Sequence, residues 1–289
     1  MGPTASGKSA LAEALAHHLD AQLINADAFQ VYRGLDIGTA KPENRSEYRL
    51  IDIVDPREQY GVGEFVRQAT AILNELWKVS RSAVVVGGTG LNIRALFEGY
   101  NTMTGPPDPT LRLELNEIHQ SLGLHSLVEQ LRHLAPDVAE QIDLANPARV
   151  KRAIERAMSP SRMIHAELPP FIKAKFGLLP DVPTLDAKIE IRMQSMMHNG
   201  WIQEVERLIR SDYSLQDPGL RAIGYRNLWE YLEGKVELED AIGTTIVETR
   251  RYAKRQRTWL RSEPNLIALN FSNGDLLVQA RDYLNYLFV

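Results

Sequence analysis

Residues 2–9 of the chain read Gly2-Pro3-Thr4-Ala5-Ser6-Gly7-Lys8-Ser9, which is the pattern of a phosphate-binding loop. In such a loop, backbone amides and the N-terminus of the following helix hold phosphate groups. Leu11, Leu15 and Leu19 recur at helical spacing directly afterwards, so the sequence predicts a helix where the loop requires one. The pattern should arise by chance in roughly one chain in a hundred of this length. A glycine-rich helix start without phosphate binding is therefore the weaker interpretation.

Two side chains of this loop have expected chemical roles. The Lys8 ammonium group would neutralise phosphate charge, and the Ser9 hydroxyl would face Mg²⁺. We therefore expect Mg²⁺ as the cofactor and residues 2–9 as the site that binds a diphosphate or a nucleotide.

The order of short apolar runs and helical patterns indicates an α/β fold. Gln22–Asn25 and Ala83–Val86 read as buried strands, and a helical pattern separates the phosphate-binding loop from the first of them. This order predicts a parallel sheet flanked by helices, as in P-loop NTPases. Such a loop normally follows the first strand of the sheet, whereas only Met1 precedes Gly2. We therefore expect that strand to be missing from this chain and one sheet edge to be destabilised.

A change in character at residues 105–180 predicts an all-helical insert. Prolines cluster at its start, and strand-like runs disappear within it. Residues 1–104 and 181–289 would then form the α/β core. The other expected elements are helices over 111–122, 147–158, 185–209 and 248–260, and a last strand over 266–271.

The composition of the 289 residues excludes several classes of site. Cysteine is absent, which excludes disulfides, thiolate metal sites and cysteine nucleophiles, and the seven histidines are scattered. Neither a long apolar run nor a secretory signal pattern is present, so we expect a cytoplasmic protein that is not bound to a membrane. The net charge is −4, but residues 248–261 contain six basic residues and one acidic residue. Any contact with nucleic acid should therefore be local.

Several longer motifs resemble those of the bacterial tRNA dimethylallyltransferase (tRNA isopentenyltransferase) family. They occur in the family's order and, with the phosphate-binding loop, span nearly the whole chain. The motifs are Asn25-Ala26-Asp27-Ala28-Phe29-Gln30-Val31-Tyr32-Arg33-Gly34-Leu35-Asp36-Ile37-Gly38-Thr39-Ala40-Lys41-Pro42, Val86-Gly87-Gly88-Thr89-Gly90-Leu91, Leu220-Arg221-Ala222-Ile223-Gly224-Tyr225 and Thr249-Arg250-Arg251-Tyr252-Ala253-Lys254-Arg255-Gln256.

This resemblance implies a reaction and its partners. A dimethylallyl group would pass from dimethylallyl diphosphate to N6 of adenine 37 in tRNA, with release of diphosphate. The tRNA would bind through its anticodon stem-loop, and the adenine would leave its stack to reach the active site. We expect the protein to act as a monomer.

The same resemblance assigns catalytic roles to Asp27, Thr89 and Arg192. Asp27 follows a predicted strand end, where open parallel sheets place ligands. Its carboxylate would accept or steer a proton from N6, which is a poor nucleophile. Arg192 would face the departing diphosphate. Judged from position alone, these residues read as an Asx-turn aspartate, a loop threonine and a solvated helix arginine.

Two groups of residues are expected to contact tRNA. The resemblance implies Asp27, Ala28, Phe29, Gln30, Thr89, Arg112, Arg149 and Arg221. Helical spacing places Arg250, Lys254 and Arg257, with Arg261, in one basic stripe, while Tyr252 and Trp259 on the opposite side would anchor the helix. Surface ion pairs remain an alternative for the arginines, and a solvated face remains one for the stripe.

The sequence departs from the family pattern at a few positions, and other functions remain open. Ala28 replaces a usual Ser, Asn92 a usual Tyr, and Lys188 a usual Arg. Residues 143–147 lack the usual His-Pro-Asn-Asp order, and residues 158–160 replace a Thr-Gly turn. The alternatives are an adenylate prenyltransferase acting on free AMP, ADP or ATP, a P-loop nucleotide kinase, and an impaired tRNA-binding homologue.

Overall fold

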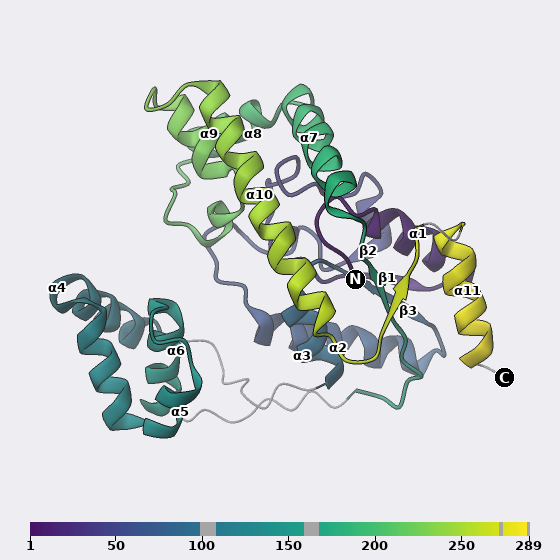
Figure 1. Ribbon diagram of the computed structural model, residues 1–289, viewed down its shortest axis with the longest axis horizontal. Helices are drawn as coiled ribbons and strands as arrows, with labels where there is room; N and C mark the ends of the chain where they lie inside the picture. Colours follow the sequence, from purple (N-terminus) through teal and green to yellow (C-terminus); the bar gives the residue numbers. More distant parts are fainter. Residues whose placement is uncertain (99–107, 159–167, 272–273, 288–289) are drawn as a thin grey trace. The chain divides into compact units, whose positions relative to one another are not determined.

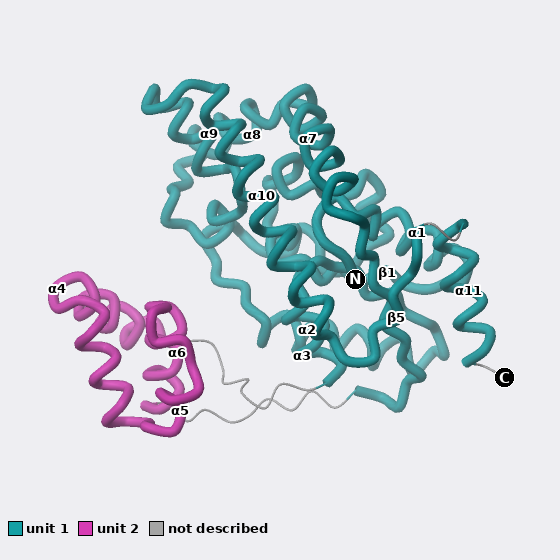
Figure 2. Tube along the Cα trace, in the orientation of Figure 1, with its two compact units in different colours: residues 1–98, 167–289 teal, residues 99–166 magenta. Residues whose placement is uncertain are grey.

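The structure is a computed structural model, and it describes residues 1–98, 108–158, 168–271 and 274–287. The chain forms two compact units (Figure 2). The first lies within residues 1–98 and 167–289, and the second within residues 99–166.

A three-stranded parallel sheet organises the N-terminal part of the first unit. Its central strand β1 (Gln22–Asn25) pairs with β2 (Tyr48–Arg49) on one side and with β3 (Ala83–Val86) on the other. Leu23 lies opposite Tyr48 and Val84. β1 and β3 have the bounds that the sequence predicts. Because the strands are parallel, the chain segments that follow β1 and β3 leave the sheet at the same edge.

Helices cover this sheet. They are α1 (Lys8–Leu19), α2 (Val62–Lys78) and α3 (Gly90–Glu98). The 3-10 helix η1 (Arg45–Glu47) directly precedes β2. Ala12 and Ala16 of α1 pack against Leu23 and Val86 of the sheet. α1 begins at Lys8, which confirms the helix predicted after the phosphate-binding loop.

A second parallel pair joins β4 (Lys175–Leu178) to β5 (Leu266–Leu269). The Met1 amine donates a hydrogen bond to the Phe176 carbonyl at 2.6 Å, and the Leu178 amide donates to the Met1 carbonyl at 2.9 Å. Within the described residues, no strand precedes the phosphate-binding loop. In the same residues, no strand-to-strand hydrogen bonding joins the pair β4–β5 to the three-stranded sheet.

Strand β4 corrects one expectation. It lies inside residues 105–180, which were predicted to be entirely helical, and it belongs to the first unit. The run Lys175-Phe176-Gly177-Leu178 is short and contains a glycine, so its weak local pattern hid a strand that β5 stabilises by pairing.

The second unit is helical in its described part. Its helices are α4 (Pro109–Leu134), α5 (Pro136–Gln141) and α6 (Pro147–Met158). Gly123, at φ 79°, breaks α4 into two segments. Leu115, Leu127 and Leu131 of α4 pack with Ile154 of α6 in a separate core.

The C-terminal half of the first unit supplies a helical layer (Figure 1). Its elements are α7 (Val182–His198), α8 (Trp201–Arg210), η2 (Pro218–Arg221), α9 (Tyr225–Leu232) and α10 (Leu238–Arg261). The last helix, α11 (Leu276–Leu287), lies beside α1 instead (Figure 1), where Ala280 packs with Leu15 and Leu269. The helix expected over 185–209 is two helices, because Gly200 adopts φ 92° between α7 and α8. Trp201 and Tyr225 are buried in the core of this layer. Among the described helices, none has the length and apolar character needed to cross a membrane.

Candidate active site

The phosphate-binding loop has a backbone shape that leaves helix amides available to a ligand. Gly7 adopts φ 85° just before α1, and no side chain caps the first amides of the helix. Ala5 also adopts a positive φ, 61°, which is costly for a residue with a Cβ. A Cβ on Gly2 would lie 2.5 Å from Ser6 Oγ, so this position requires glycine. Free amides at a helix N-terminus favour a bound anion.

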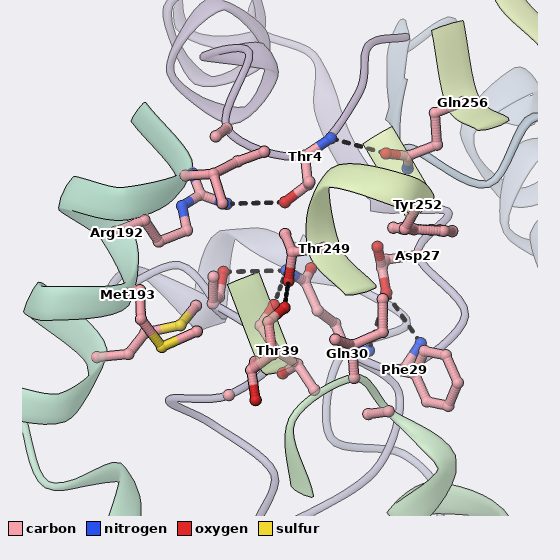
Figure 3. A pocket seen from close by; sticks show the side chains of 18 of the residues that line it. Thr4, Asp27, Phe29, Gln30, Thr39, Arg192, Met193, Thr249, Tyr252 and Gln256 are labelled. Atoms are coloured by element: carbon pink, nitrogen blue, oxygen red, sulfur yellow. Dashed lines mark hydrogen bonds between the residues drawn. The ribbon is translucent and has the colours of Figure 1, made fainter. Parts of the chain in front are cut away.

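A cavity of about 550 Å³ lies beside this loop (Figure 3). Its walls come from the loop and α1, from residues 27–40 after β1, and from α7, α8, the segment before α9, and α10. The predicted site residues that line it are Thr4, Ala5, Gly7, Lys8, Ser9, Asp27, Phe29, Gln30, Arg192 and Arg221. The cavity is not lined by the other predicted site residues of the first unit, which are Gly2, Pro3, Ser6, Ala28, Thr89, Arg250, Lys254 and Arg257.

Two desolvated cations, Lys8 and Arg192, line this cavity and have no carboxylate partner in the described part of the chain. Burial, opposed by the Asp27 charge and reinforced by the Arg192 charge, lowers the pKa of Lys8 to about 8. Burial also lowers the pKa of Arg192, although a guanidinium stays charged at neutral pH. Arg192 Nη1 donates to Thr4 Oγ1 at 3.3 Å. Two desolvated cations beside free amides make a site for a polyvalent anion.

Asp27 uses its two carboxylate oxygens differently. Oδ1 accepts hydrogen bonds from the amides of Phe29 at 2.9 Å and Gln30 at 3.4 Å, so the Asx-turn interpretation holds for this oxygen. Oδ2 accepts no hydrogen bond from the described residues. The Asp27 amide donates to Asn25 Oδ1 at 3.0 Å, which ties the residue to the end of β1. A carboxylate held in this way keeps one oxygen for a ligand proton.

Thr89 lies behind the cavity wall. Its Oγ1 is buried and makes no hydrogen bond of normal geometry with the described residues. Burial, reinforced by the Asp27 charge, raises the pKa of Tyr252 to about 12, and the Thr89, Arg255 and Gln256 side chains partly offset this. Tyr252 also lines the cavity, and its expected role as an anchor of α10 stays a prediction.

The comparisons with known proteins agree with this geometry. Residues 30–263 match the family model described as IPP transferase. The chain belongs to the IPP transferase family. It is 38% identical over 275 residues to tRNA dimethylallyltransferase 2 of Geotalea uraniireducens, covering 91% of this chain and 88% of that protein.

Solved structures of the family show the same fold. The tRNA isopentenylpyrophosphate transferase of Bacillus halodurans matches with a TM-score of 0.71 and 33% identity, covering 98% of this chain and 93% of that one. A eukaryotic dimethylallyltransferase, solved acting on tRNA, matches with a TM-score of 0.78 and 22% identity, covering 97% and 76%. The mixed α/β fold, rich in helices around small parallel sheets, is thus that of tRNA IPP transferases.

Several arginines expected to contact tRNA form ion pairs in this IPP transferase. Arg112 pairs with the buried Glu155 within the second unit, and Arg149 lies 3.8 Å from Asp143. Their tRNA contacts stay predictions, because an ion pair at the surface is also the alternative that the sequence left open.

The basic stripe of α10 is partly neutralised by another helix. Arg250 pairs with Asp186 and Glu190 of α7, whereas the Lys254 side chain is exposed. Arg257 Nη1 is buried and finds no hydrogen-bond acceptor among the described residues. Hydrogen bonds from Thr184 lower the pKa of Asp181 at the start of α7, and the Arg257 charge adds to this effect. The charge imbalance seen in residues 248–261 is therefore reduced at Arg250, where α7 supplies two carboxylates.

Sequence reasoning missed three residues that shape the site of this IPP transferase. Arg255 lines the cavity, with its guanidinium carbon 5.6 Å from the centroid of the Tyr252 ring. The buried carboxylate of Glu204 accepts hydrogen bonds from three successive backbone amides, at residues 36–38, and from Tyr225 Oη. Gln256 bonds to two loops. Arg255 and Gln256 stood in a quoted motif, whereas Glu204 had no local signal.

Proposed function

We propose that this protein transfers a dimethylallyl group from dimethylallyl diphosphate to N6 of adenine 37 in tRNA and releases diphosphate. One observation carries the proposal. A single cavity has two desolvated cations and free helix amides at one side, and a carboxylate with an unoccupied oxygen at the other. The family relationship supports the same reaction, because its members are named for it.

The donor would bind with its diphosphate on the loop of a P-loop NTPase-like core. Amides at the start of α1, the Lys8 ammonium and the Arg192 guanidinium would hold the phosphate oxygens. As the bond between C1 of the prenyl group and the diphosphate oxygen breaks, its electron pair leaves with diphosphate. Cations already in place stabilise this departing charge without reorganisation.

The acceptor would approach Asp27. The N6 nitrogen forms the new bond to C1, and Asp27 Oδ2 takes the proton that N6 must lose. The hydrogen bonds from Phe29 and Gln30 to Oδ1 keep Oδ2 directed away from the turn. Gln30 Nε2 donates to the carbonyls of Thr39 and Ala40 at 3.0 Å each, so the wall of the cavity next to the base is rigid.

The donor set at the phosphate side fits Mg²⁺. Mg²⁺ binds few protein oxygens and keeps waters and phosphate oxygens as its other ligands. The described residues hold no cluster of three acidic or histidine side chains, and the Ser9 hydroxyl lines the cavity beside Lys8. Ser9 would hold the ion, which when bound supplies further neutralisation of the leaving group.

The RNA would need contacts beyond the cavity. We propose that the anticodon stem-loop lies against the helical second unit and against the exposed Lys254 of α10, with one protein chain acting on one tRNA. Arg221 and Arg255, which line the cavity, would then neutralise phosphates next to the extruded base.

The test is prenyl transfer from labelled dimethylallyl diphosphate with Mg²⁺, with unmodified tRNA and AMP as separate acceptors. Label on tRNA that disappears in Asp27→Asn supports the proposal, since Asn keeps the shape but cannot take the proton. Exposed Asp20→Asn is the matched control and should retain wild-type activity. Label on AMP alone would replace the proposal by an adenylate prenyltransferase. Binding of tRNA without label on either acceptor would overturn it.

A further inference from the structure

Gln256 joins two segments that are far apart in the sequence. Its Oε1 accepts a hydrogen bond from the Thr4 amide at 2.8 Å, and its Nε2 donates to the Gly88 carbonyl at 2.9 Å. Thr4 belongs to the phosphate-binding loop, and Gly88 to the turn after β3. Gln256 is 6% exposed, although it also lines the cavity. Figure 3 shows Arg192 and Gln256 approaching Thr4 from opposite sides.

The Gln256 side-chain amide packs closely against Gly88. A Cβ on Gly88 would lie 2.2 Å from Gln256 Nε2, so a larger residue there would displace the amide. The Gly88 turn also runs against the loop, because the same Cβ would lie 3.2 Å from the Gly2 carbonyl. An amide is needed at position 256, since one partner is a donor and the other an acceptor.

The helix that carries Gln256 is itself fixed at this end. Glu263, just past α10, forms ion pairs with Arg94 of α3 and Lys175 of β4, and its side chain is fully buried. The Arg94 guanidinium lies over the Trp259 ring at 4.3 Å. These contacts hold the α10 backbone near Gln256 in place against α3 and β4.

We propose that Gln256 is a positioning residue that sets the conformation of the phosphate-binding loop relative to the Gly88–Thr89 turn. The Thr4 amide is bonded to α10, so the loop presents its other amides and the Thr4 hydroxyl in one arrangement. Arg192 uses that hydroxyl. Gln256 thereby fixes the distance between the bound diphosphate and the acceptor side of the cavity, where misplacement by about 1 Å can cost on the order of 100-fold in rate.

The experiment compares Gln256→Met with the wild-type chain and with Gln22→Met. Methionine has the length of glutamine and neither hydrogen bond. Gln22, at the start of β1, donates to the carbonyls of Leu23 and Glu47 and does not line the cavity, so Gln22→Met removes a matched pair of bonds elsewhere. The three readouts are hydrogen exchange of the Thr4 amide, binding of inorganic diphosphate with Mg²⁺, and the single-turnover transfer rate at saturation.

In Gln256→Met we expect faster exchange at Thr4, about 10-fold weaker diphosphate binding and a transfer rate lower by about 10-fold to 100-fold. Gln22→Met should change none of them. If Gln256→Met shows the wild-type rate of hydrogen exchange at the Thr4 amide and wild-type diphosphate binding, the proposal is overturned, whatever the thermal stability of the variant. If that variant does not fold, Gln256→Asn, which is too short to reach both partners, must show the same pattern.

The exchange and binding readouts do not need the transfer reaction. A wild-type chain that binds diphosphate but labels no acceptor would contradict the proposed function and leave the role of Gln256 testable.

Discussion

Arg192 Nη1 donates a hydrogen bond to Thr4 Oγ1 at 3.3 Å, and Arg192 has no carboxylate partner among the described residues. A desolvated guanidinium with a single neutral acceptor is unfavourable in the empty protein and favourable when an anion arrives. The first unit thus holds an uncompensated charge at the place where a diphosphate would lie.

Replacing Arg192 with Met should therefore separate stability from binding. We expect the free energy of unfolding to stay within about 1 kcal/mol of wild type or to rise, because an unpaired charge is removed. Diphosphate binding should weaken by about 100-fold, since a buried charge-assisted contact is lost. Urea denaturation and calorimetric titration measure the two effects. Arg81→Met, which removes an exposed pair with Asp20, is the control. A large loss of stability in Arg192→Met would indicate a structural role.

The lowered pKa of Lys8 predicts a proton uptake. Burial brings this pKa to about 8, below its value of 10.5 in the unfolded chain. Between these two values the unfolded state binds more protons, so the stability of the empty protein should rise with pH from about 8 to 10.5. A bound diphosphate favours the charged ammonium. Near pH 8 to 9, binding of dimethylallyl diphosphate should therefore take up a fraction of a proton and weaken as pH rises.

Calorimetric titrations in two buffers of different ionisation enthalpy measure this uptake. Lys8→Met should abolish most of it. An uptake that is unchanged in Lys8→Met would assign the proton to another group.

Through Glu204, the free energy of unfolding should be coupled to the conformation of the cavity wall. Its carboxylate accepts from the amides of residues 36–38, which lead into Thr39 and Ala40 beside Gln30. Glu204→Gln places a side-chain NH₂ group against backbone amides that are themselves donors. It should lower the free energy of unfolding by about 1–3 kcal/mol. It should also raise the KM for tRNA more than that for the donor. Glu206→Gln, on the same helix in an exposed pair with Arg210, should cost at most about 0.5 kcal/mol. Equal costs in the two variants, measured by urea denaturation, would contradict this.

The α10 cations should differ in their effect on tRNA binding. Lys254 is exposed, whereas Arg250 already pairs with Asp186 and Glu190. Lys254→Gln should weaken tRNA binding and reduce the slope of log K against log salt by about 0.7 to 0.9, the value for one lost phosphate contact. Arg250→Gln should change the slope less. Titrations at several salt concentrations test both, and an unchanged slope in Lys254→Gln would remove this residue from the RNA interface.

Local sequence determined the glycine-rich turn before α1, the helix that starts at Lys8, the strands β1 and β3, and the place of Asp27 after a strand end. These features depend on backbone conformation and on periodicity over a few residues, which neighbouring residues specify. The longer motifs added the family, because several long patterns in one order rarely occur together.

Tertiary structure alone decided which charges remain uncompensated and which segments meet. Within the described ranges Arg192 has no carboxylate partner, while Arg250, on a similar sequence background, acquires two from α7. Gln256 reaches Thr4 across 252 positions of sequence, and β4 becomes a strand because β5 pairs with it. Burial and pairing of this kind depend on which distant side chains fill the neighbouring space, and no local pattern encodes that.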